Sequence, residues 1–210
     1  MKKEFQHWQQ HIFKVILITV TAIIISGCER TDYNSGIKYH HGKGVVQDYA
    51  EAVKWYKLAA DKGHKGAQYN LGVMYYKGEG VVQDYVEAVK WYKLAAEQGE
   101  SSAQYNLGHI YDFGNNVIGQ DYAEAIRWYK LASEQEHASA QHSLGVKYVK
   151  GQGVIKNYMT AHMWWNIAAS NGMAMGKKHR DQIEKDMTSD DIKKAQNMAR
   201  ECVKKKYKDC

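Results

Sequence analysis

The amino-acid sequence predicts an all-α solenoid built from antiparallel helix pairs. Among its 210 residues there is no proline, a residue that would interrupt helix interiors. The segments 44–60 and 80–96 are identical except that Ala50 is replaced by Val86. Tryptophan recurs with a spacing of 36 or 37 residues, at Trp55, Trp91, Trp128 and Trp164. A fixed period of this length is the signature of stacked repeats.

The first 27 residues are interpreted as an export signal and are set apart from the fold. Lys2, Lys3 and Lys14 lead into a charge-free, mostly aliphatic run over 15–25, which small residues follow. A membrane-spanning helix is the weaker interpretation, because the stretch 15–27 would extend only about 20 Å as a helix, against roughly 30 Å of hydrocarbon.

The end of this segment contains a candidate lipidation site. Ile25-Ser26-Gly27-Cys28 resembles the lipobox of bacterial lipoproteins, in which cleavage leaves the cysteine as a lipidated first residue. The resemblance implies a mature protein that begins at Cys28, is attached to a membrane by its lipid and faces the periplasm or the cell exterior. The alternative is a cysteine that follows an ordinary secretory signal by chance.

Residues 28–175 are predicted to form four helix pairs, over about 31–66, 67–102, 103–139 and 140–175. In the second pair we expect the first helix over about 68–77, with Leu71 and Tyr75 on one face. A glycine lies inside this helix in every pair, at Gly36, Gly72, Gly108 and Gly145. Because an interior glycine costs about 1 kcal/mol relative to alanine, we expect a neighbouring helix to approach closely there.

The turn inside each pair has its own signals. Gly78 and Gly80 favour positive φ angles, and the helix that follows is predicted to begin with a capping box. The box consists of an Asp and a Glu three residues later, at Asp84 with Glu87, Asp48 with Glu51 and Asp121 with Glu124. In the fourth pair Asn157 keeps the cap, while Thr160 replaces the glutamate.

The second helix of a pair is predicted to pack through alternating small and large side chains. In the second pair these are Ala88, Trp91, Tyr92 and Ala95. The helix then ends with left-handed backbone at a glycine, at Gly63, Gly99 and Gly172, whereas the third pair has Glu136 there and a less well specified exit. No pair buries its stripe alone, so neighbouring pairs must stack.

The recurring pattern LGxxY, GxG, D, A, WY, AA over about 31–175 resembles the Sel1-like repeat family, which is related to the tetratricopeptide repeats. The resemblance implies a right-handed superhelical solenoid with a C-terminal capping helix. The first pair departs from the pattern at Ser35, where the other pairs have a leucine, so its first helix is expected to fray.

Residues 176–210 are predicted to form a helical cap with a basic tail. Thr188 or Ser189 would begin its helix, and an apolar stripe follows at Ile192, Ala195, Ala199, Cys202 and Val203. The segment 173–210 contains 11 Lys or Arg against 7 Asp or Glu. On an exported protein this charge favours contact with anionic membrane or an envelope polymer over nucleic acid, and a solvated helix face is the alternative.

The two cysteines of this cap are not expected to pair with each other. Eight residues of helix would separate the Cα atoms of Cys202 and Cys210 by about 12 Å, beyond the limit of about 7 Å for a disulfide. We therefore expect a buried Cys202 and a free Cys210, which allows weak self-association of two chains through Cys210.

The sequence offers no catalytic or metal-binding constellation. The periodic glutamates Glu51, Glu87 and Glu124 are explained by helix capping, and the histidines share no metal-ligand spacing. Motifs of the form HExxH or CxxC do not occur. The sequence thus favours a non-catalytic protein without cofactor or metal over an envelope enzyme.

The family resemblance implies that a protein or peptide binds the concave surface formed by the first helix of each pair. The corresponding groove residues are Tyr33, Ile37, His40, Tyr69, Val73, Tyr76, Tyr105, His109, Asp112, His142, Val146 and Val149. The alternative is that Tyr69 and Tyr105 only pack between pairs. An exported factor that acts on host proteins or on polysaccharide assembly would use the same groove. Nucleic acid is not an expected partner.

Overall fold

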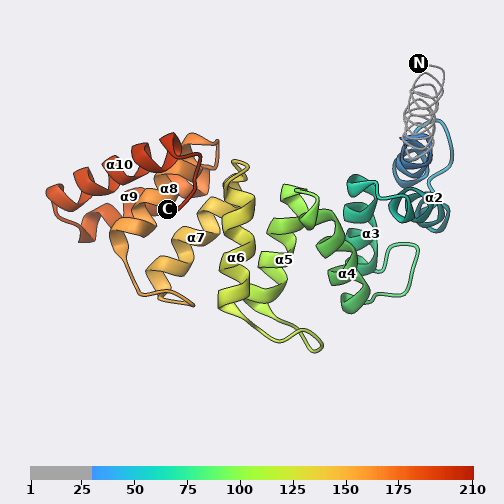
Figure 1. Cartoon of the computed structure of the whole chain (residues 1–210), viewed down its shortest axis with the longest axis horizontal. Coiled ribbons are helices and arrows are strands. Elements are labelled where there is room, and N and C mark those ends of the chain that lie inside the picture. The colour runs from blue at the N-terminus through green and yellow to red at the C-terminus, as the bar shows by residue number, and fades with distance from the viewer. Residues whose placement is uncertain (1–29) are drawn as a thin grey trace, which may run out of the picture. The chain divides into compact units, whose positions relative to one another are not determined.

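A computed structural model describes residues 30–210 of the chain (Figure 1). Residues 30–41 are helical, and the helices that follow are α2 (Tyr49–Asp61), α3 (Lys65–Lys77), α4 (Tyr85–Glu97), α5 (Ser101–Phe113), α6 (Tyr122–Ser133), α7 (Ala138–Lys150), α8 (Tyr158–Ser170), α9 (Ala174–Ile183), the 3₁₀ helix η1 (Glu184–Asp186) and α10 (Ser189–Lys204). All regular structure in the described range is helical, which confirms the predicted all-α fold. The export signal and Cys28 lie outside the described residues. None of the helices within 30–210 has the length and apolarity that crossing a bilayer requires.

The chain forms two compact units that meet at residues 84 and 85. In the N-terminal unit, the helix over 30–41 contacts α2 through Gly36 and Tyr56, and α2 packs against α3. In the C-terminal unit, each helix from α4 to α9 packs against the next, and α10 packs against α8. Consecutive antiparallel packing of this kind is the arrangement that the repeat predicts.

The first helices of the second and fourth pairs begin before the starts that the sequence predicts, and a histidine caps each of them. Helix α3 starts at Lys65 rather than near Gln68, because the His64 side chain serves as its cap: Nδ1 accepts a hydrogen bond from the Ala67 N–H at 3.2 Å. His137 caps α7 in the same way, with 3.4 Å between Nδ1 and the Ala140 nitrogen. Histidine is not among the residues that usually signal a helix start, so the prediction missed these turns.

Inside the pairs, an aromatic ring lies against each of three interior glycines. The Tyr56 ring covers Gly36, the Tyr129 ring covers Gly108 and the Trp165 indole covers Gly145. A β-carbon at Gly108 would lie 2.5 Å from Tyr129 Cδ1, closer than any side chain tolerates. The predicted close approach is confirmed at these three positions. Only glycine leaves room for the ring, and the lower helix propensity of glycine is the cost of this contact.

Second helices are capped by half of the predicted box. The carboxylate or amide oxygens of Asp48, Asp121 and Asn157 accept the N–H three residues later at 2.9 to 3.0 Å, as predicted. The reciprocal half is wrong for Asp48 and Asp121, because their own N–H groups donate to the carbonyls of Tyr39 and Tyr111. The glutamate side chains instead form ion pairs within the same helix, Glu51 with Lys54 and Glu124 with Arg127.

The ends of these helices and the first helix are well formed. Gly63, Gly99 and Gly172 have φ angles of 94°, 78° and 90°, which confirms the predicted left-handed ends, and Glu136 adopts the same region with φ of 61°. The expected fraying at Ser35 is not seen: the backbone is helical there, and Ser35 Oγ donates to the Thr31 carbonyl at 3.1 Å.

The C-terminal cap contains two helices and a closed tail. Thr188 begins α10, its Oγ1 accepting from the Asp191 N–H at 3.2 Å. Ala195, Ala199 and Cys202 are buried as predicted, whereas Val203 is wrongly placed in the stripe, since it is 47% exposed.

The prediction of a free Cys210 is wrong. Cys202 and Cys210 form a disulfide with 5.6 Å between their Cα atoms. The chain does not continue as helix to Cys210, because α10 ends at Lys204 and the backbone then turns back through left-handed residues at Lys206, Tyr207 and Asp209. Tyr207 is buried by this turn. Because the Cys210 thiol is used in the disulfide with Cys202, it is not available for the predicted self-association of two chains.

The contact between glycine and ring can be tested by Gly108→Ala. The added β-carbon must displace the buried Tyr129 ring, and such overpacking costs about 1 to 3 kcal/mol, more than the gain of up to ~1 kcal/mol from alanine's helix propensity. We expect a lower free energy of unfolding by chemical denaturation. Gly119→Ala is the control, since a β-carbon there meets open space. Equal stability of the two variants would show that the ring contact is not needed.

Candidate interaction groove

Two adjoining hollows lie along α7 in the C-terminal unit, each with a volume of about 280 Å³. The α5–α7 hollow is bounded by α5, α7 and the turns that follow them. The α7–α9 hollow is bounded by α7, α8, α9 and η1. Val146 and Lys150 line both, so the two hollows form one continuous surface, which we call the groove.

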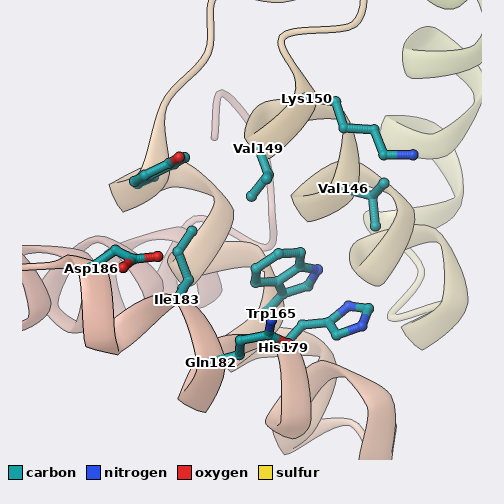
Figure 2. Close-up of a pocket in the computed structure, with 9 residues that line it drawn as sticks. Val146, Val149, Lys150, Trp165, His179, Gln182, Ile183 and Asp186 are labelled. Carbon is teal, nitrogen blue, oxygen red and sulfur yellow. The ribbon is translucent and has the colours of Figure 1, made fainter.

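The α7–α9 hollow is apolar and has a polar rim. The Trp165 indole forms its floor, held by a hydrogen bond from Nε1 to the His142 carbonyl at 3.1 Å. Figure 2 shows Val146 and Val149 above the indole and Ile183 beside it. The rim is polar, with Lys150, His179, Gln182 and Asp186. Such a hollow takes one large apolar side chain and orients it through its polar edge.

The α5–α7 hollow has a charged floor. The carboxylate of Asp112 and the ammonium of Lys147 form an ion pair, with side chains only 5% and 4% exposed. The Tyr129 hydroxyl donates to the same carboxylate at 3.2 Å, and Lys147 also donates to Gln152 Oε1 at 2.8 Å. Asp112 therefore lies in the expected region but is occupied by internal partners, so it supports the hollow from below.

Tyr105 and His109 form part of the wall of the α5–α7 hollow. The Tyr105 ring stacks on His137 with 4.8 Å between centroids, and it lies 5.8 Å from the Tyr129 ring. Burial raises the pKa of Tyr105 and lowers the pKa of His109, so both are neutral at neutral pH. Tyr105 thus packs between helices and also lines the hollow. The two roles that the sequence left open for it, packing and groove lining, are therefore compatible.

The six predicted groove residues of the C-terminal unit all line one of the two hollows: Tyr105, His109, Asp112, His142, Val146 and Val149. The other six lie in the N-terminal unit and are half-buried there: Tyr33, Ile37, His40, Tyr69, Val73 and Tyr76. Tyr33 stacks on His64 with 4.2 Å between centroids, as Tyr105 does on His137. His40 Nε2 lies 3.7 Å from Glu79 Oε2.

Several groove residues were missed by the sequence analysis. Trp165 was missed because it occupies the tyrosine position of the repeated Trp-Tyr motif, which was assigned to packing. The signal that could have identified it is that Trp164-Trp165 replaces the Trp-Tyr of the other pairs. His179 and Ile183 were assigned to the cap, yet α9 packs on α8 as the first helix of a further pair. Within residues 30–210, no cluster of three or more His, Cys, Asp or Glu side chains is placed to hold a metal ion.

Comparison with known proteins gives a consistent result. A profile of the Sel1 repeat matches residues 32–64, 66–100, 101–137 and 138–173. The chain is 33% identical to a Sel1 repeat protein from Oxalobacter formigenes, with a TM-score of 0.71 over 82% of this chain and 72% of that one. Helicobacter pylori cysteine rich protein B shares the fold at 20% identity and a TM-score of 0.50, over 63% of this chain and 94% of that one.

A third similar structure is a protective antigen present in uropathogenic Escherichia coli strains. It is 39% identical to the chain, with a TM-score of 0.75 over 84% of this chain. The chain spans only 38% of the length of that antigen. A search of curated proteins found no significant match.

The ion pair under the groove predicts a large coupling between its two side chains. Lys147→Met should lower the free energy of unfolding by about 3 to 5 kcal/mol, because the buried Asp112 carboxylate is left without a cation. Adding Asp112→Asn to this variant removes the uncompensated charge and should restore most of the loss. The measurement is a double-mutant cycle by chemical denaturation. Additive effects of the two substitutions would contradict the ion pair.

Proposed function

The chain belongs to the Sel1 repeat family, and on this premise we propose that it is a protein-binding scaffold whose groove holds a segment of its partner. Proteins of this family commonly act as interaction scaffolds, and they are typically non-catalytic. The repeat architecture supports this role, because in the C-terminal unit it presents α5, α7 and α9 along the groove.

The observation that supports the proposal most directly is the α7–α9 hollow. Its floor is a tryptophan with 5% exposure, held in place by a hydrogen bond and by the glycine beneath it. Rigid, apolar pockets with polar rims are where binding energy concentrates in protein interfaces. Because the indole is already fixed, the floor of the hollow does not have to reorganise when a partner binds. The entropy cost of binding is then mainly that of ordering the partner side chain.

The occupant that fits best is an extended protein segment. A large apolar side chain of this segment would enter the α7–α9 hollow, and its polar neighbours would lie along the α5–α7 hollow. Lys150 lines both hollows, so its ammonium group would favour an acidic residue between these two positions. The neutral Tyr105 and His109 would offer hydrogen bonds without adding charge.

A non-catalytic role is consistent with what the carboxylates do. Glu51 and Glu124 are engaged by Lys54 and Arg127, and Asp112 is engaged by Lys147. These groups stabilise helix starts and the groove floor. Each is therefore accounted for without a role in acid–base chemistry.

We also propose that the protein is anchored to the bacterial envelope by a lipid on Cys28. The support is the lipobox-like sequence, since this cysteine lies outside the described residues. The described helix is already formed at residue 30, two residues further along the chain. Lipid attachment would therefore hold the N-terminal unit close to the bilayer, without a long stalk.

A host-facing role is the second candidate. It is favoured by the similarity to a protective antigen present in uropathogenic Escherichia coli strains. The same groove would then hold a host protein instead of an envelope protein. Crosslinking in native envelopes followed by identification of the captured protein distinguishes the two settings.

The groove assignment is tested by Val149→Asp. Val149 is half-buried in the α7–α9 hollow, so a carboxylate there would have to be desolvated by an incoming apolar side chain. We expect the protein crosslinked by the wild type to be recovered at least tenfold less, with the melting temperature little changed. Val203→Asp on α10 introduces the same charge at an exposed position and should capture normally. Undiminished capture by the Val149 variant would place the binding surface elsewhere.

The anchor is tested by Cys28→Ala. Without a thiol there is no site for the lipid, so we expect an exported, folded protein that no longer partitions with membranes or incorporates labelled fatty acid. Membranes are washed with high salt before analysis to remove proteins held by charge. Membrane association that survives both the substitution and the wash would refute the lipid anchor.

A further inference from the structure

Two histidines join α7 to α9 beside the α7–α9 hollow. His142 Nε2 lies 3.0 Å from His179 Nδ1, and the two ring planes are inclined by 32°. Both rings are partly buried, so they are held by packing and still reached by solvent. Figure 2 shows His179 beside the Trp165 indole, whose ring centre is 5.1 Å away. The proposed scaffold function uses these two residues as groove lining, but it gives no role to the contact between them.

The setting keeps both imidazoles available as ligands. One of the two facing nitrogens accepts the hydrogen bond between the rings, so it presents a lone pair, as a metal ligand must. The Trp165 indole also packs against His142, with 6.3 Å between centroids, which restrains that ring on a second side.

The separation of the two nitrogens matches a shared ion. Imidazole nitrogens bind divalent transition metals at about 2.0 to 2.1 Å. Two such bonds to nitrogens 3.0 Å apart enclose an angle of about 94° at the metal. That angle is near the roughly 90° between adjacent ligands in square-planar and octahedral complexes, and it is smaller than the roughly 109° of tetrahedral zinc.

We propose that His142 Nε2 and His179 Nδ1 form a binding site for a divalent transition metal of the copper and nickel class. Imidazole is a preferred ligand of both ions, and copper binds nitrogen ligands most tightly among the divalent first-row metals. Water fills the remaining coordination positions on the side of the hollow. With two protein ligands, the site is open and binds more weakly than a closed structural site.

Metal binding changes which nitrogen of one ring carries its proton. In the hydrogen-bonded pair, one of the two facing nitrogens donates an N–H to the other. When the ion binds, that proton moves to the outer nitrogen of the same ring. Each ring turns about its coordinating nitrogen, so that both lone pairs point toward the metal while the two nitrogens keep their separation. Each imidazole keeps its one proton, so the step releases no net proton.

The test is Cu²⁺ titration of the full chain by calorimetry. To remove competing histidines, the reference chain contains His7→Gln, His11→Gln, His40→Gln and His41→Gln. We expect it to bind one Cu²⁺ and to melt at a higher temperature with the ion. Adding His142→Gln or His179→Gln should weaken binding at least tenfold. His109→Gln, in the neighbouring hollow, is the matched control and should leave binding unchanged.

Electron paramagnetic resonance on the reference chain gives a second readout that does not depend on the stability of the variants. Two coupled imidazole nitrogens on the bound Cu²⁺ are expected. The site would be overturned if the reference chain did not bind Cu²⁺ or if fewer than two nitrogens were coupled to the ion. It would also be overturned if the His142 and His179 variants bound Cu²⁺ as tightly as the reference chain. The hydrogen bond would then be only a structural link between α7 and α9.

Discussion

The architecture depends on the contact between an interior glycine and an aromatic ring, which the first, third and fourth helix pairs share. Only a residue without a side chain leaves room for the ring of Tyr56, Tyr129 or Trp165 directly on the backbone of the opposing helix. The distance between the two helices of a pair is thereby fixed by the thickness of one aromatic ring. Because the third and fourth pairs close in the same way, α5 and α7 repeat their orientation, and a continuous groove forms along them in the C-terminal unit.

The two hollows of the groove differ because equivalent positions of the third and fourth pairs have different residues. Where the third pair places Tyr129 against its glycine, the fourth places Trp165, whose larger ring extends beyond the contact and becomes the floor of the α7–α9 hollow. Below the neighbouring hollow, the hydroxyl of Tyr129 instead binds the buried Asp112. The same structural position thus gives an apolar hollow in one pair and supports a charged floor in the adjacent one.

The sequence predicts the pairs well because their signals are local and periodic. The glycine and ring positions, the Asp and Asn caps and the left-handed ends all follow from residues within one period. Helix starts at His64 and His137 were missed, since a capping imidazole resembles any surface histidine in sequence. The hollow around Trp165 and His179 was also missed, because it forms between the last repeat and α9, which is outside the period. The Cys202–Cys210 disulfide depends on left-handed backbone at Lys206, Tyr207 and Asp209, and lysine and tyrosine rarely adopt that conformation.

The closed tail also covers one face of the last helices that the structure describes. A repeat array whose last helix presents an apolar face is a template for another copy, and head-to-tail stacking of that kind grows into filaments. Here the disulfide turns the chain back after α10, and Tyr207 is buried against the last core, with its hydroxyl 3.3 Å from Glu136. A second molecule would have to displace this covalently held turn before it could stack. Oxidation of the two cysteines therefore opposes polymerisation at this end of the fold.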